Sequence, residues 1–71
     1  MNSEKSTINV NIFGMEYPVK GGGDTEYVIQ VAKYVNDTMV ELDKTMQSKS
    51  SIRVAILAAM NIADQLFQAK K

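Results

Sequence analysis

Carboxylates are the side chains of this 71-residue chain that could carry acid–base or metal chemistry, because the sequence contains no Cys and no His. Without Cys and His, the common nucleophile–base pairs cannot be assembled. The carboxylates are spread over polar positions, where nothing apolar would raise a pKa for acid–base work. We therefore expect no enzyme activity, no metal and no cofactor from these acidic residues: Glu4, Glu16, Asp24, Glu26, Asp37, Glu41, Asp43 and Asp64.

Two other groups of residues could recognise a nucleotide or a nucleic acid. Gly21–Gly23 precede a helix start and could cradle a phosphate, but the Asp24 carboxylate would occupy the same backbone donors. Asn9 and Asn11 could read base edges, but eight basic and eight acidic residues leave no surplus to neutralise phosphates. We interpret the glycines as a connector and the asparagines as a solvated strand face, and we expect neither a small-molecule substrate nor a nucleic-acid partner.

A β-hairpin over residues 7–20 is the first element that the pattern predicts, after a short polar tail at residues 1–6 that we expect to be disordered. Apolar and polar residues alternate from Thr7 to Phe13, Gly14-Met15 interrupts the alternation, and it resumes to Lys20. Pro18 has no N–H for a ladder, so the second strand should be an edge or should turn this nitrogen outward.

An amphipathic helix over residues 24–46 should follow, with Asp24 as its N-cap. Its apolar residues recur at spacings of three and four, which is typical of a single buried stripe. These residues are Val28, Val31, Ala32, Val35, Met39, Leu42 and Met46.

The last predicted helix, residues 51–71, is apolar on nearly every side, and Ser50 or Ser51 is its N-cap. Such a helix must be buried nearly all round, and the preceding residues are too few to cover it. A chain this short without disulfides or metals commonly gains stability from partners. Asn61 either fixes the helix register from a buried position or faces water. We predict an α+β homodimer with a single ββαα domain, residues 1–71, whose interface contains Ile52, Ala55, Ile56, Leu57, Ala59, Met60, Ile62, Ala63 and Leu66.

Three segments resemble the ZapA family of bacterial cell-division proteins. They are Ile12-Phe13-Gly14 followed by Tyr17-Pro18-Val19, the helix containing Val31-Ala32 and Met39 to Leu42, and the run Ala58 to Leu66. The third segment is the most specific, being similar to the family's Ala-Ala-Leu-Asn-Ile-Ala-Asp-Glu-Leu. The resemblance covers about residues 8 to 69, which correspond to the family's globular head.

The resemblance implies a cytoplasmic adaptor that binds FtsZ, the tubulin-like division GTPase, and crosslinks its filaments at mid-cell. It also implies dimers through the head and last helix, and tetramers where that helix continues as a coiled coil. Met15 stands where many family members carry a basic residue implicated in FtsZ contact. The candidate FtsZ contacts around the inter-helix segment are Lys44, Lys49 and Arg53.

Two other functions remain open from the residues alone. One is a dimeric strand–helix–helix DNA-binding regulator that reads a groove through Asn9 and Asn11. The other is a generic oligomerisation module of a larger assembly. No apolar run approaches the roughly 20 residues that span a bilayer, so we expect no membrane insertion.

Overall fold

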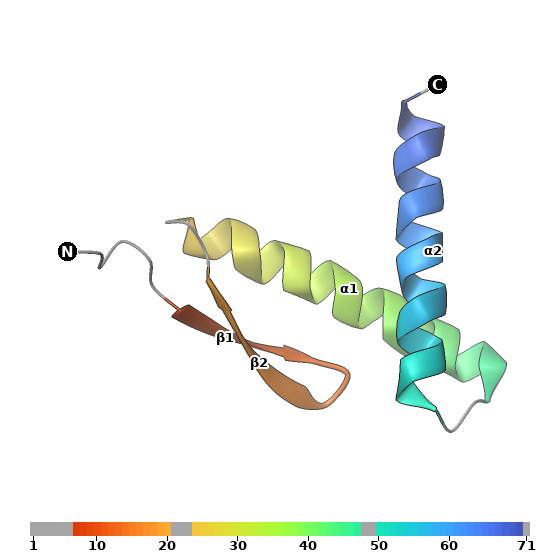
Figure 1. The fold of residues 1–71 in the computed structure, drawn as a ribbon, viewed down its shortest axis with the longest axis horizontal. Coiled ribbons are helices and arrows are strands. Elements are labelled where there is room, and N and C mark those ends of the chain that lie inside the picture. Colours follow the sequence, from red (N-terminus) through yellow and green to blue (C-terminus); the bar gives the residue numbers. More distant parts are fainter. Residues whose placement is uncertain (1–6, 21–23, 48–49, 71) are drawn as a thin grey trace. The chain divides into compact units, whose positions relative to one another are not determined.

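A computed structural model of the chain describes residues 7–20, 24–47 and 50–70. It contains two strands followed by two helices (Figure 1), which confirms the predicted ββαα order. The elements are β1 (Thr7–Ile12), β2 (Met15–Lys20), α1 (Thr25–Met46) and α2 (Ser51–Ala69). The predicted tail at residues 1–6 lies outside the described residues. The chain divides into two compact units, Met1–Asp37 and Thr38–Lys71, so that α1 contributes to both.

Strands β1 and β2 pair antiparallel, with Ile12 opposite Met15 and Asn9 opposite Pro18. The turn between them is Phe13-Gly14, with φ of 54° and 82°. This corrects the sequence-based interpretation, in which the first strand reached Phe13 and Gly14-Met15 interrupted it. Two consecutive positive φ values are the requirement of a two-residue type I′ turn, whose twist matches that of the flanking strands. The turn therefore begins one residue earlier than the glycine alone indicated.

The apolar side of the hairpin and the first half of α1 supply the buried residues of the first unit. Val10 and Ala32 are buried, and Ile8, Ile12 and Val19 are half-buried. The predicted N-cap is confirmed, since Asp24 Oδ1 accepts a hydrogen bond from the Tyr27 N–H at 3.0 Å. Within the predicted apolar stripe Val31 is an exception, because it is 46% exposed and lies at the margin of the helix face.

The hairpin turn is tied to α1 by a long-range hydrogen bond. The backbone N–H of Phe13 donates to Asn36 Oδ1 at 2.7 Å, in a partly buried position. Because the left-handed turn points this N–H away from the strand ladder, the Asn36 side chain supplies the acceptor that it otherwise lacks.

The buried residues of the second unit are Met39 on α1 and Val54 and Ala58 on α2. Helix α1 ends at Met46, and the next residue, Gln47, has a φ of 55°, the left-handed conformation typical of the residue after a helix. Of the two serines predicted as the N-cap of α2, Ser50 holds this position, and its hydroxyl accepts a hydrogen bond from the Arg53 N–H at 3.2 Å. At the other end, the Lys70 N–H donates to the carbonyls of Leu66 and Phe67.

Candidate functional site: an exposed apolar face on the last helix

Helix α2 has two apolar faces, of which the chain buries one. Val54 is fully buried and Ala58 is 2% exposed, and they stand one helical turn apart. At 100° per residue, the opposite side of the helix carries a second apolar stripe. Ile52, Ile56 and Phe67 on this stripe are 71%, 57% and 65% exposed. We define the α2 stripe as Ile52, Ile56, Ala59, Met60, Ala63, Leu66 and Phe67.

The residues predicted for a dimer interface are accessible in the single chain. All of them are exposed except Ile62, which is half-buried at the border between the two faces. Leu57 is exposed to 38% but lies on the arc of Arg53 and Asp64, about 100° from Ile56 around the helix. Phe67 lies on the α2 stripe but is not among the residues predicted for the interface, although it is spaced four residues from Ala63.

The beginning of α2 forms a shallow apolar groove with one cation at its side. Its volume is about 480 Å³, and it is lined by Ser50, Ile52, Arg53, Ile56 and Leu57. The Ile52 and Ile56 side chains that line this groove also belong to the α2 stripe. The groove and the stripe are therefore one continuous surface, suited to another apolar side chain rather than to a charged ligand.

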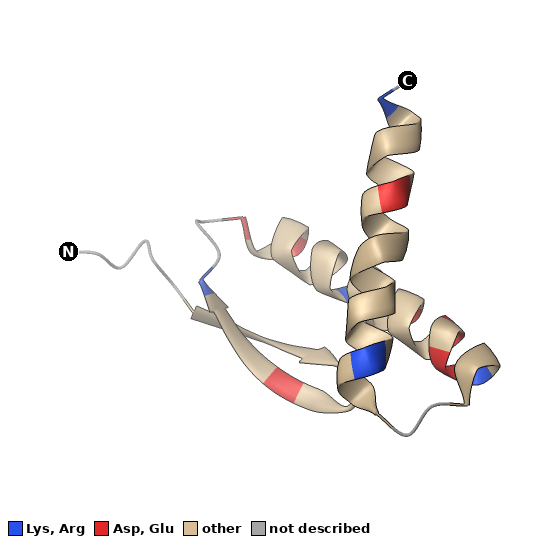
Figure 2. Cartoon of the chain, turned by 45° about the vertical axis from the view of Figure 1, so that its right-hand side comes forward, with Lys and Arg blue, Asp and Glu red and all other residues tan. Residues whose placement is uncertain are grey.

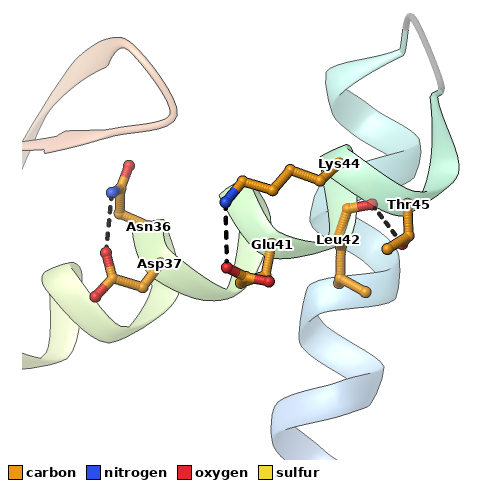
Figure 3. Close-up of polar contacts among 6 residues, drawn as sticks. All are labelled: Asn36, Asp37, Glu41, Leu42, Lys44 and Thr45. Atoms are coloured by element: carbon orange, nitrogen blue, oxygen red, sulfur yellow. Dashed lines mark hydrogen bonds and ion pairs between the residues drawn. The ribbon is translucent and has the colours of Figure 1, made fainter.

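The candidate FtsZ-contact residues flank the segment between the helices. Lys44 lies in the last turn of α1, and its Nζ is 3.4 Å from Glu41 Oε2 (Figure 3). Both side chains are well exposed, so this pair restrains the lysine only weakly. Arg53 lies in the first turn of α2 and is exposed. Lys49 lies outside the described residues.

Asn61 is one of the residues whose role the sequence left open, and the structure places it at the surface. It is exposed, and its Oδ1 accepts a hydrogen bond from Gln65 Nε2 at 2.9 Å, one turn along the helix. Within the single chain this amide therefore faces water rather than fixing the register of a buried helix.

Charges are interspersed along the helices and the hairpin rather than gathered into one basic surface (Figure 2). Glu16 stands opposite Asn11 on the polar side of the hairpin, where it would repel a nucleic-acid phosphate. This placement disfavours base reading by Asn9 and Asn11. The zero net charge of the sequence points the same way.

The acidic residues that the structure describes are scattered over the surface of the hairpin and the helices (Figure 2). No three of them lie close enough to hold a metal ion within residues 7–20, 24–47 and 50–70. The pKa of Asp37 is lowered by the Lys33 ammonium, which donates a hydrogen bond to it at 2.8 Å. Asn36 also donates to this carboxylate at 3.4 Å (Figure 3). A general acid must carry a proton at the working pH, whereas the lowered pKa keeps the Asp37 carboxylate ionised.

Membrane insertion through a helix is not supported either. Neither α1 nor α2, as described, has the length and continuous apolar character needed to cross a bilayer.

The fold and this surface define a small α+β protein whose last helix leaves an apolar stripe exposed in the single chain. A family model described as cell division protein ZapA matches residues 8–71. The chain is 37% identical over 68 residues to the cell division protein ZapA of Bacillus thuringiensis strain Al Hakam, covering 96% of this chain and 76% of that protein. It is 36% identical over 70 residues to the cell division protein ZapA of Shouchella clausii, covering 99% of this chain and 90% of that protein.

Two solved structures share the fold. A ZapA mutant dimer from Geobacillus stearothermophilus superposes with a TM-score of 0.78 and 27% identity, over 99% of this chain and 83% of that one. A structure described as an unknown conserved bacterial protein from Pseudomonas aeruginosa PAO1 superposes with a TM-score of 0.79 and 28% identity, over 90% of this chain and 71% of that one. The chain belongs to the ZapA family of cell division proteins, which are not enzymes.

Proposed function

We propose that this chain is a division-site adaptor that dimerises through the α2 stripe and binds FtsZ, so that one dimer crosslinks two filaments. Proteins of the ZapA family bind and bundle FtsZ. The observation that carries the dimer is the apolar face of α2 opposite the buried Val54 and Ala58. Large contiguous apolar surface is uncommon on monomeric proteins and marks contact sites.

Two copies of the α2 stripe suit each other chemically. The stripe combines large side chains with the small residues Ala59 and Ala63, which let two helix backbones approach closely. It carries no charge, so a twofold arrangement brings no like charges together. An extension of this contact beyond Ala69 as a coiled coil, and with it a tetramer, belongs to the same proposal.

The linkage of two protomers in one dimer explains how an FtsZ contact that is weak for each protomer can still bundle filaments. Each protomer of a symmetric dimer presents the same surface once, and two tethered contacts gain affinity through their effective concentration. For the FtsZ surface we propose Lys44, Lys49 and Arg53, the basic residues around the inter-helix segment. We place this activity in the cytoplasm at mid-cell, where the FtsZ ring assembles.

The dimer is tested by one charge on the α2 stripe. Ile56→Glu should convert the dimer to a monomer in sedimentation equilibrium, because a carboxylate would be buried against apolar side chains. Gln68→Glu is the matched control, since it adds the same charge on the far arc of the helix. Leu57→Glu measures how far the interface extends around α2. An Ile56→Glu protein that remains a folded dimer would remove the stripe from the interface.

The FtsZ contact is tested by co-sedimentation with polymerised FtsZ. Reversing the charges in Lys44→Glu/Arg53→Glu should abolish pelleting with filaments while the dimer persists. Lys20→Glu, a comparable reversal on β2, is the control and should pellet as the parent chain does. Unchanged pelleting of the double variant would place the FtsZ surface elsewhere.

A further inference from the structure

The methionines in the described part of the chain differ in how far solvent reaches them. Met60 on the α2 stripe is 63% exposed, and Met15 after the hairpin turn is 59% exposed. Met39 is buried and Met46 is half-buried. A peroxide converts an exposed methionine thioether to the sulfoxide, which is polar, whereas packing protects a buried one. Within residues 7–20, 24–47 and 50–70, an oxidant therefore reaches Met60 and Met15 first.

Met60 differs from Met15 in what surrounds it. Side chains on a helix lean towards its N-terminus, so the Met60 thioether is directed towards the turn that holds Ile56 and Leu57. Both of these residues line the apolar groove at the beginning of α2. Met15 begins β2, opposite Ile12, in the first compact unit. Oxidation of Met60 consequently changes the α2 stripe, and oxidation of Met15 does not.

We propose that Met60 is a redox-sensitive switch of the α2 dimer, in which peroxide oxidation of its sulfur separates the two chains and reduction lets them pair again. The inference rests on the proposed dimer through the α2 stripe. In the oxidation, one oxygen atom passes from hydrogen peroxide to the sulfur, which loses two electrons, and the peroxide becomes water. In the reduction, two thiols supplied through a methionine sulfoxide reductase remove this oxygen as water and become a disulfide.

The sulfoxide does not suit the α2 stripe because its oxygen is a hydrogen-bond acceptor. In the dimer this acceptor would be buried against apolar side chains such as Ile56, away from water. An unpaired buried polar group of this kind should raise the dimer dissociation constant roughly tenfold. A twofold dimer contains Met60 twice, so complete oxidation should raise the constant by about 100-fold.

The same burial should make the oxidation depend on assembly. In the free chain Met60 is as exposed as Met15, so an oxidant reaches both alike. In the proposed dimer the partner's α2 stripe covers Met60, whereas Met15 lies outside the stripe. The switch therefore acts on free protomers and prevents them from pairing again.

Treatment of the parent chain with hydrogen peroxide tests the proposal, with peptide mass spectrometry and sedimentation equilibrium as the two measurements. Well below the dimer dissociation constant, Met60 and Met15 should gain sulfoxide at similar rates. Well above it, the rate at Met60 should fall while the rate at Met15 does not. The oxidised chain should be a monomer at concentrations where the parent is a dimer. A methionine sulfoxide reductase with dithiothreitol should restore the dimer.

Three variants assign the effect to one sulfur. Met60→Leu keeps the volume and apolar character of the side chain, so it should remain a dimer after the same peroxide treatment. Met15→Leu is the matched control and should dissociate on oxidation as the parent does. Met60→Gln places an amide oxygen near the position of the sulfoxide oxygen and should weaken the dimer without any oxidant.

Two results would overturn the switch. One is an unchanged dimer dissociation constant in a chain whose Met60 is oxidised. The other is equal dissociation of oxidised Met60→Leu, because another methionine would then be responsible. If Ile56→Glu dissociates the dimer but oxidation of Met60 does not, the dimer proposal stands and the switch falls. If Ile56→Glu remains a folded dimer, the α2 interface falls and the switch falls with it.

Discussion

At the scale of single residues, the hairpin turn determines the register of the first unit. Phe13 and Gly14 both have positive φ, but only the glycine adopts this conformation freely. Phe13 is held there by the hydrogen bond from its N–H to Asn36. The sequence marked the turn through Gly14, but it could not indicate that an aromatic residue would share it, because that choice depends on an acceptor 23 residues away.

Gly14→Ala should lower the free energy of unfolding by about 1 kcal/mol, because a Cβ is strained at positive φ. No atom lies within 4 Å of the added Cβ, so the cost is conformational and not steric. Urea unfolding followed by circular dichroism measures it. Phe13→Asn is the companion variant and should be neutral or stabilising, since Asn tolerates this conformation. An alanine variant as stable as the parent would contradict the type I′ turn.

Asn36→Ala should destabilise the chain by about 1–3 kcal/mol, because it leaves the partly buried Phe13 N–H without an acceptor. Thr45→Ala is the control: its hydroxyl donates to the Leu42 carbonyl at the helix surface (Figure 3), and losing it should change little. The measurement is again urea unfolding. If both substitutions lowered the free energy of unfolding by the same amount, the hydrogen bond from Phe13 to Asn36 would contribute no more stability than the exposed one at Thr45.

Lys33→Gln should raise the pKa of Asp37 towards its ordinary value, since the Lys33 hydrogen bond is the largest cause of its lowering. A lowered carboxyl pKa contributes stability above the unfolded-state pKa, and this stability is lost as the pH falls through the folded-state pKa. The stability of the parent should therefore not change with pH above about 5 on account of this pair. NMR titration of the Asp37 carboxyl carbon provides the test, and an unchanged pKa in the variant would contradict the pairing.

At the scale of elements, the sequence was sufficient for the types and order of the strands and helices. Alternation predicted the hairpin. The cap Asp24, and Ser50 or Ser51 for the second helix, predicted where the helices begin, because capping depends on residues within one turn. The end of α1 at Met46 was also predicted, because the apolar pattern breaks at Gln47. This signal was sufficient although Gln47, and not a glycine, occupies the left-handed position after the helix.

Gln47→Gly should raise the stability by about 0.5–1 kcal/mol, because it removes the strain of a non-glycine residue at a φ of 55°. A chain of this size should then melt roughly 2–8 °C higher. Differential scanning calorimetry measures the shift, and Gln68→Gly inside α2 is the control, which should lower the melting temperature. A lower melting temperature for Gln47→Gly would contradict the described helix end.

At the scale of the whole molecule, stability should depend on protein concentration. The folded chain leaves large apolar side chains of α2 exposed, so the proposed dimer would supply part of the stability that so short a chain lacks. Because association favours the folded state, a tenfold rise in concentration should raise the melting temperature. The Ile56→Glu variant should melt lower and lose this dependence. A parent chain with a concentration-independent melting temperature would argue against an obligate dimer.

The sequence by itself determined the order of the elements and the family resemblance, because these depend on local pattern and composition. It did not determine which side of α2 meets its own chain. A helix that is apolar nearly all round has no single periodic face for the sequence to mark. Only the tertiary structure decided that Val54 and Ala58 are buried, which leaves Ile52, Ile56 and Phe67 exposed.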